Sequence, residues 1–379
     1  MKDRRMYLRI ITVVLVFFLF VGMISVSADV IPDLKGYWTG INAVQYSPDG
    51  GFENVTTDLK SIQISGQDGR AIVGELKHYK KKIGKNVTEI ISGALSPDGH
   101  MLELDNEGDG VTFGEIISDH ELYNTVLFPE RGPMIILYHV VKSGTDVSSS
   151  ETVPDLIGTW NLTHKRNNAA STTGLLTIDQ QQGRIWRGTE EIQDEDGTLI
   201  KETLAGTVGE TGTIYAASAD GAFMFGSLQG NDSIQSVFVI PGDTDGTYVV
   251  DSELTKNETM IPQSDLPYPV MAGDWKIDDR KVIENGTITD KGPVSDEWIS
   301  YSNQTGRFFT AVRHNQPVKT PSGTTVSGIF RTTDEAILTG ADSAMVLYHV
   351  IDNSTMEAII NRKDEAASLY LDVLTRKSE

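Results

Sequence analysis

The stretch Leu34-Lys35-Gly36-Tyr37-Trp38 is followed further along the chain by Gln67-Asp68-Gly69-Arg70, and the patterns Gly-x-Trp and Gln-x-Gly-Arg that they contain each return twice. The repeated motif residues are Gly36, Trp38, Gln67, Arg70, Gly158, Trp160, Gln181, Arg184, Gly273, Trp275, Gln304 and Arg307. The Gly-x-Trp glycines lie 122 residues apart (36 to 158) and then 115 residues apart (158 to 273). A repeat of this length indicates one module present in three copies.

Each copy has the pattern of β-strands. Apolar residues alternate upstream of each Gly-Arg, as at Ile62 and Ile64, which is typical of a half-buried strand. Turn tetrads such as Ser47-Pro48-Asp49-Gly50 predict hairpins. In the first copy the pattern predicts eight strands, which start near Gly36, Leu59, Ile72, Thr88, Met101, Val111, Leu122 and Met134.

Eight sequential strands in a copy favour an up-and-down barrel, because closure removes exposed sheet edges. A β-sandwich repeat is the alternative, but that fold carries its buried Trp on an interior strand, whereas here Trp lies on the first. We therefore expect an all-β chain of three tandem antiparallel eight-stranded β-barrel-like domains after an N-terminal segment. The expected bounds are 1–28 for a signal peptide or membrane anchor, 29–142, 154–256 and 267–379 for barrel repeats 1 to 3, and 143–153 and 257–266 for linkers.

The Leu-x-Gly-x-Trp first strand at 34–38 and 156–160 resembles that of the calycins, the lipocalin and avidin type of β-barrel. The third copy has Met271 in place of the leucine. The resemblance implies that each Trp plugs one barrel end and packs against a basic residue that follows the last strand. On this chain it points to Lys142, Lys256 and Arg376. Avidin's biotin contacts have no counterpart that we can place here, so biotin is not expected.

The N-terminus has the pattern of an export signal. Basic residues precede an apolar run over 10–24, and Val26-Ser27-Ala28 offers small residues for cleavage. An uncleaved anchor is the alternative, and would be the chain's one contact with a membrane. Cleavage removes four of 32 basic and one of 53 acidic residues, which leaves a net charge of −24. Such a charge opposes nucleic-acid binding. We expect an extracytoplasmic protein, secreted or associated with the cell envelope.

The N-glycosylation sequons also indicate an extracytoplasmic protein. Asn-x-Ser/Thr includes eight of the fifteen asparagines, more than the roughly two or three expected by chance. We therefore expect glycosylation at Asn54, Asn86, Asn161, Asn231, Asn257, Asn285, Asn303 and Asn353. The other interpretation is that Asn-x-Thr suits β-turns and edge strands.

The sequence nominates no catalytic residue and no cofactor. The chain has no cysteine, which excludes thiol catalysis, thiolate metal sites and disulfides. No two histidines form His-x-His or His-x-x-x-His, so a zinc site is unsupported. Residues 105–110 resemble the first half of a calcium loop, which makes Asp105, Glu107 and Asp109 metal candidates; an acidic hairpin turn is the alternative.

We interpret the repeated motifs as structural: glycine permits a hairpin, Trp fills a barrel end, and Arg or Gln bonds strand-end carbonyls. The leading hypothesis is a glycosylated, exported, non-catalytic protein of three modules that binds a small ligand, a glycan or an envelope protein. One alternative is a structural component of the cell envelope. Another is a carbohydrate-active enzyme with one specialised repeat, since such chemistry needs only two carboxylates. An eight-stranded barrel is either filled or holds one small ligand, and the pattern leaves both open.

Overall fold

The computed structural model is all-β. It describes residues 31–55, 60–80, 84–96, 99, 101–106, 110–128, 131–145, 153–166, 171–193, 197–240, 248–256, 268–314, 325–339, 345–361 and 368–377. The expected signal or anchor at 1–28 lies outside them. The described part holds no helix of the length and apolarity needed to cross a membrane.

The first barrel is an antiparallel meander in which the last strand, β9, pairs with the first, β1. A short strand, β2, pairs with the far half of β1 and adds a hairpin outside the ring of eight. The strands are β1 (Gly36–Ser47), β2 (Gly51–Asn54), β3 (Ser61–Asp68), β4 (Ala71–Lys80), β5 (Lys85–Leu95), β6 (Met101–Asn106), β7 (Val111–Ser118), β8 (Glu121–Phe128) and β9 (Met134–Lys142).

The second barrel closes with eight strands and no added hairpin strand within the described residues. Its strands are β10 (Gly158–Lys165), β11 (Thr172–Gln182), β12 (Ile185–Gln193), β13 (Leu199–Val208), β14 (Thr213–Ser218), β15 (Phe223–Gln229), β16 (Ser233–Ile240) and β17 (Tyr248–Thr255).

The third barrel repeats the plan of the first: β26 pairs with β18 to close the ring, and β19 pairs with the far half of β18. Its strands are β18 (Gly273–Glu284), β19 (Thr287–Asp290), β20 (Val294–Thr305), β21 (Phe308–His314), β22 (Thr325–Phe330), β23 (Glu335–Thr339), β24 (Met345–Val350), β25 (Thr355–Asn361) and β26 (Ser368–Arg376). Three tandem eight-stranded barrels are therefore confirmed.

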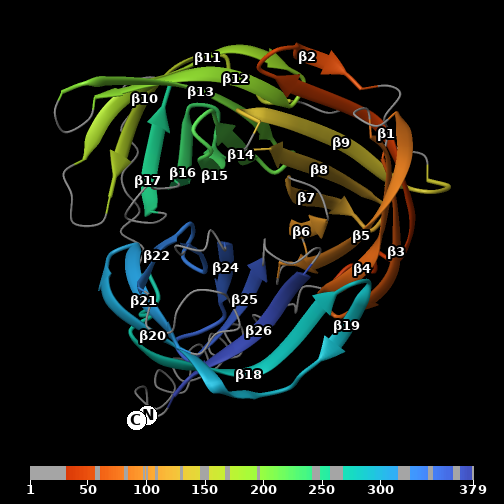
Figure 1. The fold of residues 1–379 in the computed structure, drawn as a ribbon. Coiled ribbons are helices and arrows are strands. Elements are labelled where there is room, and N and C mark those ends of the chain that lie inside the picture. The colour runs from red at the N-terminus through yellow and green to blue at the C-terminus, as the bar shows by residue number, and fades with distance from the viewer. Residues whose placement is uncertain are drawn as a thin grey trace, which may run out of the picture.

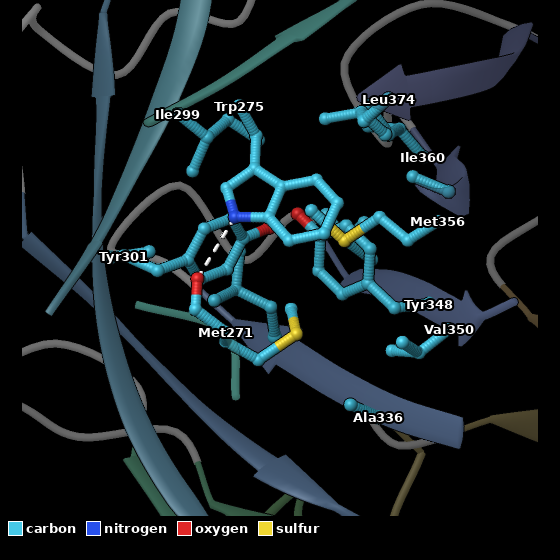
Figure 2. Packing of buried hydrophobic residues seen from close by; sticks show 14 of the residues in the cluster. Met271, Trp275, Ile299, Tyr301, Ala336, Tyr348, Val350, Met356, Ile360 and Leu374 are labelled. Carbon is cyan, nitrogen blue, oxygen red and sulfur yellow. Dashed lines mark hydrogen bonds between the residues drawn. The ribbon is translucent and has the colours of Figure 1, made fainter. Parts of the chain in front are cut away.

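Each barrel has its own apolar core. In the third, Trp275 lies among Met271, Tyr301, Tyr348 and Met356 (Figure 2). The side chains of Trp38, Trp160 and Trp275 are fully buried in their respective cores. Burial of large side chains at about 25 cal/mol per Å² of apolar area is the main source of stability for such a module.

The three barrels are arranged around a common centre (Figure 1). The last strand of each barrel packs on the fourth strand of the next: β9 on β13, β17 on β22, and β26 on β5. Equivalent faces therefore meet head to tail, and the series closes into a ring. At the centre, outward-facing apolar side chains of all three barrels, among them Phe113, Phe225 and Ile337, form one cluster.

At two of the three junctions, a hairpin of one barrel makes additional contacts with its neighbour. The hairpin strand β19 packs on β3 and β4 of the first barrel, where Lys281 pairs with Asp68 at 2.6 Å. The β1–β2 hairpin reaches the second barrel, where Gln182 donates to Asn54 Oδ1 at 3.0 Å. At the junction of the second and third barrels the described residues include no such hairpin, and the contacts there are the packing of β17 on β22 and the ion pair of Arg307 with Asp251.

Candidate functional site

The Gly-x-Trp motif caps one end of each barrel. The indole Nε1 donates to the backbone carbonyl four residues earlier, at 2.8 Å for Trp38, 2.9 Å for Trp160 and 2.8 Å for Trp275; Figure 2 shows the bond from Trp275 to Met271. The glycine has a positive φ in all three copies, between 125° and 137°. This backbone strains any residue with a side chain, which accounts for the glycine.

A basic side chain lies over each capping indole. The charged groups stand 5.6 Å (Lys142), 5.2 Å (Lys256) and 5.1 Å (Arg376) from the ring centroids. Each also donates to a backbone carbonyl of the segment that precedes the first strand. The contacts implied by the calycin resemblance are therefore present in all three barrels.

The Gln of each Gln-x-Gly-Arg phrase fixes the same incoming segment. Gln67 Oε1 accepts from the backbone N–H of Leu34 at 2.9 Å, and its Nε2 donates to the carbonyl of Pro32 at 2.8 Å. Gln181 and Gln304 repeat both bonds. The phrase thus ties the chain entry to the β3–β4 turn and its equivalents, which is a structural role.

The Arg of the phrase has a second role that the sequence did not indicate. Each guanidinium donates to a strand-end carbonyl in its own barrel, at Leu95, Val208 and Phe330. Each also reaches another barrel. Arg70 pairs with Glu357 at 2.8 Å, Arg307 pairs with Asp251, and Arg184 lies 5.1 Å from the ring centroid of Tyr123. One repeated residue therefore contributes to all three junctions of the ring.

A cleft of about 60 Å³ opens where the three barrels meet. Its apolar surface includes Phe113 of the first barrel, Phe225 of the second and Leu347 of the third. The two Phe rings pack edge to face, with centroids 5.2 Å apart. One water needs about 10–15 Å³ of such space, so the cleft holds several waters or a small organic group. Within the described residues, this is a cavity lined by both aromatic and polar groups, and it lies between barrels rather than inside one.

The charges around the cleft are balanced. Arg70 pairs with Glu357, and Arg331 pairs with Glu335. Burial lowers the pKa of Arg70, although the Glu357 carboxylate opposes that shift. Ser96 and His349 also belong to the polar lining. A mainly apolar lining with a few polar groups is the usual composition of a small-molecule site at a domain interface.

The inward-facing polar residues differ among the barrels. In the second, His164 Nε2 lies 2.9 Å from Glu190 Oε1, and its Nδ1 lies 2.7 Å from Ser252 Oγ. Nearby, Glu202 and Asp220 hydrogen-bond, and burial first and that bond second raise the pKa of Glu202 to about 7. The relay of Ser252, His164 and Glu190 is buried throughout. It therefore serves as an internal polar network that satisfies its own members.

The glycosylation and metal-binding candidates from the sequence differ in how far the structure describes them. The seven sequon asparagines within the described residues are all exposed: Asn54, Asn86, Asn161, Asn231, Asn285, Asn303 and Asn353. Asn257 lies outside the described residues. So do Glu107 and Asp109, while Asp105 is described only as a backbone position on β6. Among the described residues no group of three His, Asp or Glu side chains is placed to hold a metal.

Sequence reasoning missed the residues of the cleft. Their positions depend on how the barrels pack, and no spacing within one copy encodes that packing. One signal was present: Met134-Ile135-Ile136-Leu137-Tyr138 is almost wholly apolar rather than alternating. An unbroken apolar run indicates a strand buried on both faces, and β9 does pack on a second barrel.

No protein-family model matches the chain, and no curated protein does. Solved structures similar to this chain include the following three. A protein of unknown function from the DUF3598 family of Nostoc punctiforme has 11% identity over 90% of this chain and 96% of its own, with a TM-score of 0.25. Transferrin binding protein B of Neisseria meningitidis has 9% identity over 92% and 77%, with a TM-score of 0.23. A de novo designed fluorescence-activating β-barrel has 18% identity over 27% and 94%, with a TM-score of 0.22.

Proposed function

We propose that the chain is an exported, glycosylated, non-catalytic binding protein of three calycin-like barrels, and that the cleft between the barrels holds its ligand. The observation that carries this proposal is the cleft, because aromatic and paired charged residues from three separate repeats line it together. The exposed sequons and the capping contacts support the exported, calycin-like part of the proposal.

The lining also suggests the class of ligand. Two Arg and two Glu side chains balance one another, so neither a strong anion nor a strong cation is favoured. The Phe rings favour an aromatic or aliphatic body. A cleft of about 60 Å³ takes a small molecule or the end group of a larger one. We therefore propose a ligand with a compact apolar group and a neutral or zwitterionic polar end.

Ligand-observed NMR with a panel of small aromatic and zwitterionic compounds tests the proposal. Leu347 is half-buried and lines the cleft, so Leu347→Trp fills it. Leu175 is 41% exposed and lies outside the cleft, so Leu175→Trp is the matched control. We expect compounds that bind the native protein to lose at least tenfold in affinity with Leu347→Trp and to be unaffected by Leu175→Trp. Equal binding by both variants would exclude the cleft.

The pair Glu202 and Asp220 is the observation closest to the carbohydrate-active alternative. Glycosidase carboxyl groups stand roughly 5–10 Å apart, so that a sugar or a water fits between them. Glu202 and Asp220 instead hydrogen-bond to each other. A direct contact of this kind differs from the separated carboxyl groups of a glycosidase, so we favour binding over hydrolysis.

A further inference from the structure

The second copy of the module is shorter than the other two in one segment. From the Gly of Gly-x-Trp to the Gln of Gln-x-Gly-Arg the separation is 31 residues in the first copy (36 to 67), 23 in the second (158 to 181) and 31 in the third (273 to 304). In the first and third barrels this segment forms a first strand of 12 residues and a hairpin strand of four. In the second barrel the first strand, β10, has eight residues. The second copy is therefore too short between the motifs to form the same hairpin.

The hairpins of the first and third barrels contact one particular turn of the neighbouring barrel. Lys281, on the hairpin of the third barrel, pairs with Asp68 at 2.6 Å. Asn54, on the hairpin of the first, accepts a hydrogen bond from Gln182 at 3.0 Å. Asp68 and Gln182 are the variable residue of Gln-x-Gly-Arg in their own barrels. In the third barrel that residue is Thr305, which is exposed.

The turn that holds Thr305 lies at the junction with the second barrel. Arg307, two residues further on, pairs with Asp251 of that barrel. Asp251 lies opposite Lys165, the last residue of β10. The short first strand of the second barrel therefore ends beside the turn, at the point from which a longer strand would continue into a hairpin.

The surface next to this turn is polar in the third barrel and apolar in the first. Six residues after the Gln of the motif, the first barrel has Val73, which is buried in one cluster with Ile283 of the neighbouring hairpin. The matched residue of the third barrel is Thr310, whose hydroxyl lies 3.2 Å from that of the exposed Ser302. Hydroxyl groups both donate and accept hydrogen bonds. An occupant rich in hydroxyl groups therefore suits this surface better than an apolar hairpin does.

A sequon coincides with the same turn. Asn303-Gln304-Thr305 has the acceptor pattern, and Asn303 is exposed with a φ of 50° in a bulge of β20. We propose that an N-linked glycan on Asn303 occupies the position that a hairpin takes at the other two junctions, and that it stabilises the contact between the second and third barrels. This role rests on the proposed glycosylation and gives one of the glycans a structural purpose.

The modification needs a phosphate-activated oligosaccharide as its donor. Transfer forms a bond between Asn303 Nδ2 and the anomeric carbon, breaks the bond of that carbon to the phosphate oxygen, and releases one amide proton. The sugar hydroxyls then lie beside the turn, where Ser302 and Thr310 offer hydrogen-bonding groups.

The test measures the junction with and without the glycan. Peptide mass spectrometry gives the occupancy of Asn303 in protein purified from its own source. We expect Asn303→Gln and Thr305→Val, which both abolish the sequon, to raise hydrogen exchange of the amides of β17 and β22 at least threefold, with no change in β9 and β13. The same two variants made in a host without N-glycosylation should match their unsubstituted parent. A rise of the same size there would show that the side chains act without a glycan, and would overturn the proposal.

Two further variants serve as controls. Thr305→Ser keeps the sequon, and Asn353→Gln removes an exposed sequon between β24 and β25 of the same barrel; both should leave exchange at β17 and β22 unchanged. An occupied Asn303 whose loss has no effect on exchange would overturn the structural role and leave the proposed glycosylation standing. An Asn303 that carries no glycan would overturn the role, and bare asparagines at all eight sequons would overturn the glycosylation with it.

Discussion

The guanidinium of Arg70 lies 2.8 Å from the carboxylate of Glu357, although the two residues belong to the first and third barrels. The same guanidinium donates to the carbonyl of Leu95 at 3.0 Å, at the end of β5. Arg70 therefore joins the end of a strand in its own barrel to the barrel that closes the ring. The contact therefore joins two barrels that are not consecutive along the chain.

We expect Glu357→Gln to destabilise the protein by about 2 kcal/mol. Breaking a buried ion pair leaves one charge unpaired at a cost of roughly 3–5 kcal/mol, and the partial exposure of Glu357 (18%) reduces it. Urea unfolding measures the change. The matched control is Lys35→Gln, whose exposed pair with Asp33 at 3.8 Å should contribute less than about 0.5 kcal/mol. Similar losses in both variants would show that the junction does not depend on this pair.

The two capping residues of the second barrel, Trp160 and Lys256, should contribute unequally to the stability of the protein. Lys256→Met removes a cation–π contact and one hydrogen bond, which we expect to cost about 1 kcal/mol. Trp160→Ala removes a fully buried indole and should cost about 3–5 kcal/mol. Thermal unfolding checks the order. Lys201→Met, at an exposed lysine on the same barrel, is the control. A loss with Lys256→Met as large as that with Trp160→Ala would contradict this account.

The capped barrel was predictable because its determinants are local. The eight strand starts predicted for the first copy fall within three residues of the barrel strands; the structure has β3 at Ser61 and β5 at Lys85 where the sequence predicted Leu59 and Thr88. The hairpin strand β2 was missed, because four residues after a Pro-Asp-Gly turn carry too little alternation to stand out.

The ring and the cleft could not be predicted in the same way. The Arg of Gln-x-Gly-Arg satisfies a carbonyl of its own barrel, which fully explains its repetition. The contacts of this Arg with a neighbouring barrel depend instead on how the barrels pack, through β26 on β5 and the equivalent strand pairs.

Stability should depend on Glu202 between pH 5 and 8. Burial and the hydrogen bond with Asp220 raise the pKa of Glu202 to about 7. The folded protein keeps this proton to higher pH than the unfolded chain does, so the stability it contributes is complete below about pH 4.5 and is lost as pH rises through 7. We expect Glu202→Gln to reduce the fall in unfolding free energy between pH 5 and 8 by about 1–2 kcal/mol.

Urea titrations at each pH measure this effect, with Glu53→Gln at an exposed carboxylate as the control. The titration of Asp220 does not overlap with that of Glu202. Burial raises the pKa of Asp220, but hydrogen bonds with Glu202 and Ser218 lower it, and the net shift is downward. Any effect of Asp220 on stability therefore falls at more acid pH. A pH dependence that is the same in Glu202→Gln as in the native protein would count against a shifted Glu202.

The sequons give a prediction about occupancy. Glycan transfer requires an accessible asparagine, and the seven within the described residues are exposed. Asn54 differs, because its Oδ1 accepts a hydrogen bond from Gln182 across a barrel junction. We therefore expect Asn54 to be the least occupied of the seven when the protein is purified from its own source and its peptides are analysed by mass spectrometry. Gln182→Ala should raise occupancy at Asn54 alone; unmodified peptides at all seven positions would show that the sequons are unused.

The buried ion pair of the third barrel should be replaceable. Arg280 donates two bonds to Asp372, each of 2.7 Å, and Asp372 is 1% exposed. Four residues before the capping Lys or Arg, the other barrels have Ser252 and Tyr138 where this one has Asp372. The barrel fold therefore forms without a charge at this position.

We expect Asp372→Asn to cost about 3 kcal/mol, because it leaves Arg280 buried with its charge poorly compensated. Replacing the network with apolar side chains and an uncharged amide (Arg280→Met, Asp372→Leu, Glu297→Gln) should recover most of that loss, since well-packed apolar residues replace buried ion pairs at little cost. Urea unfolding of the single and triple variants provides the comparison. A triple variant no more stable than Asp372→Asn would mean that the charges specify the packing of this barrel, and that its interior diverged under a constraint the other two copies do not share.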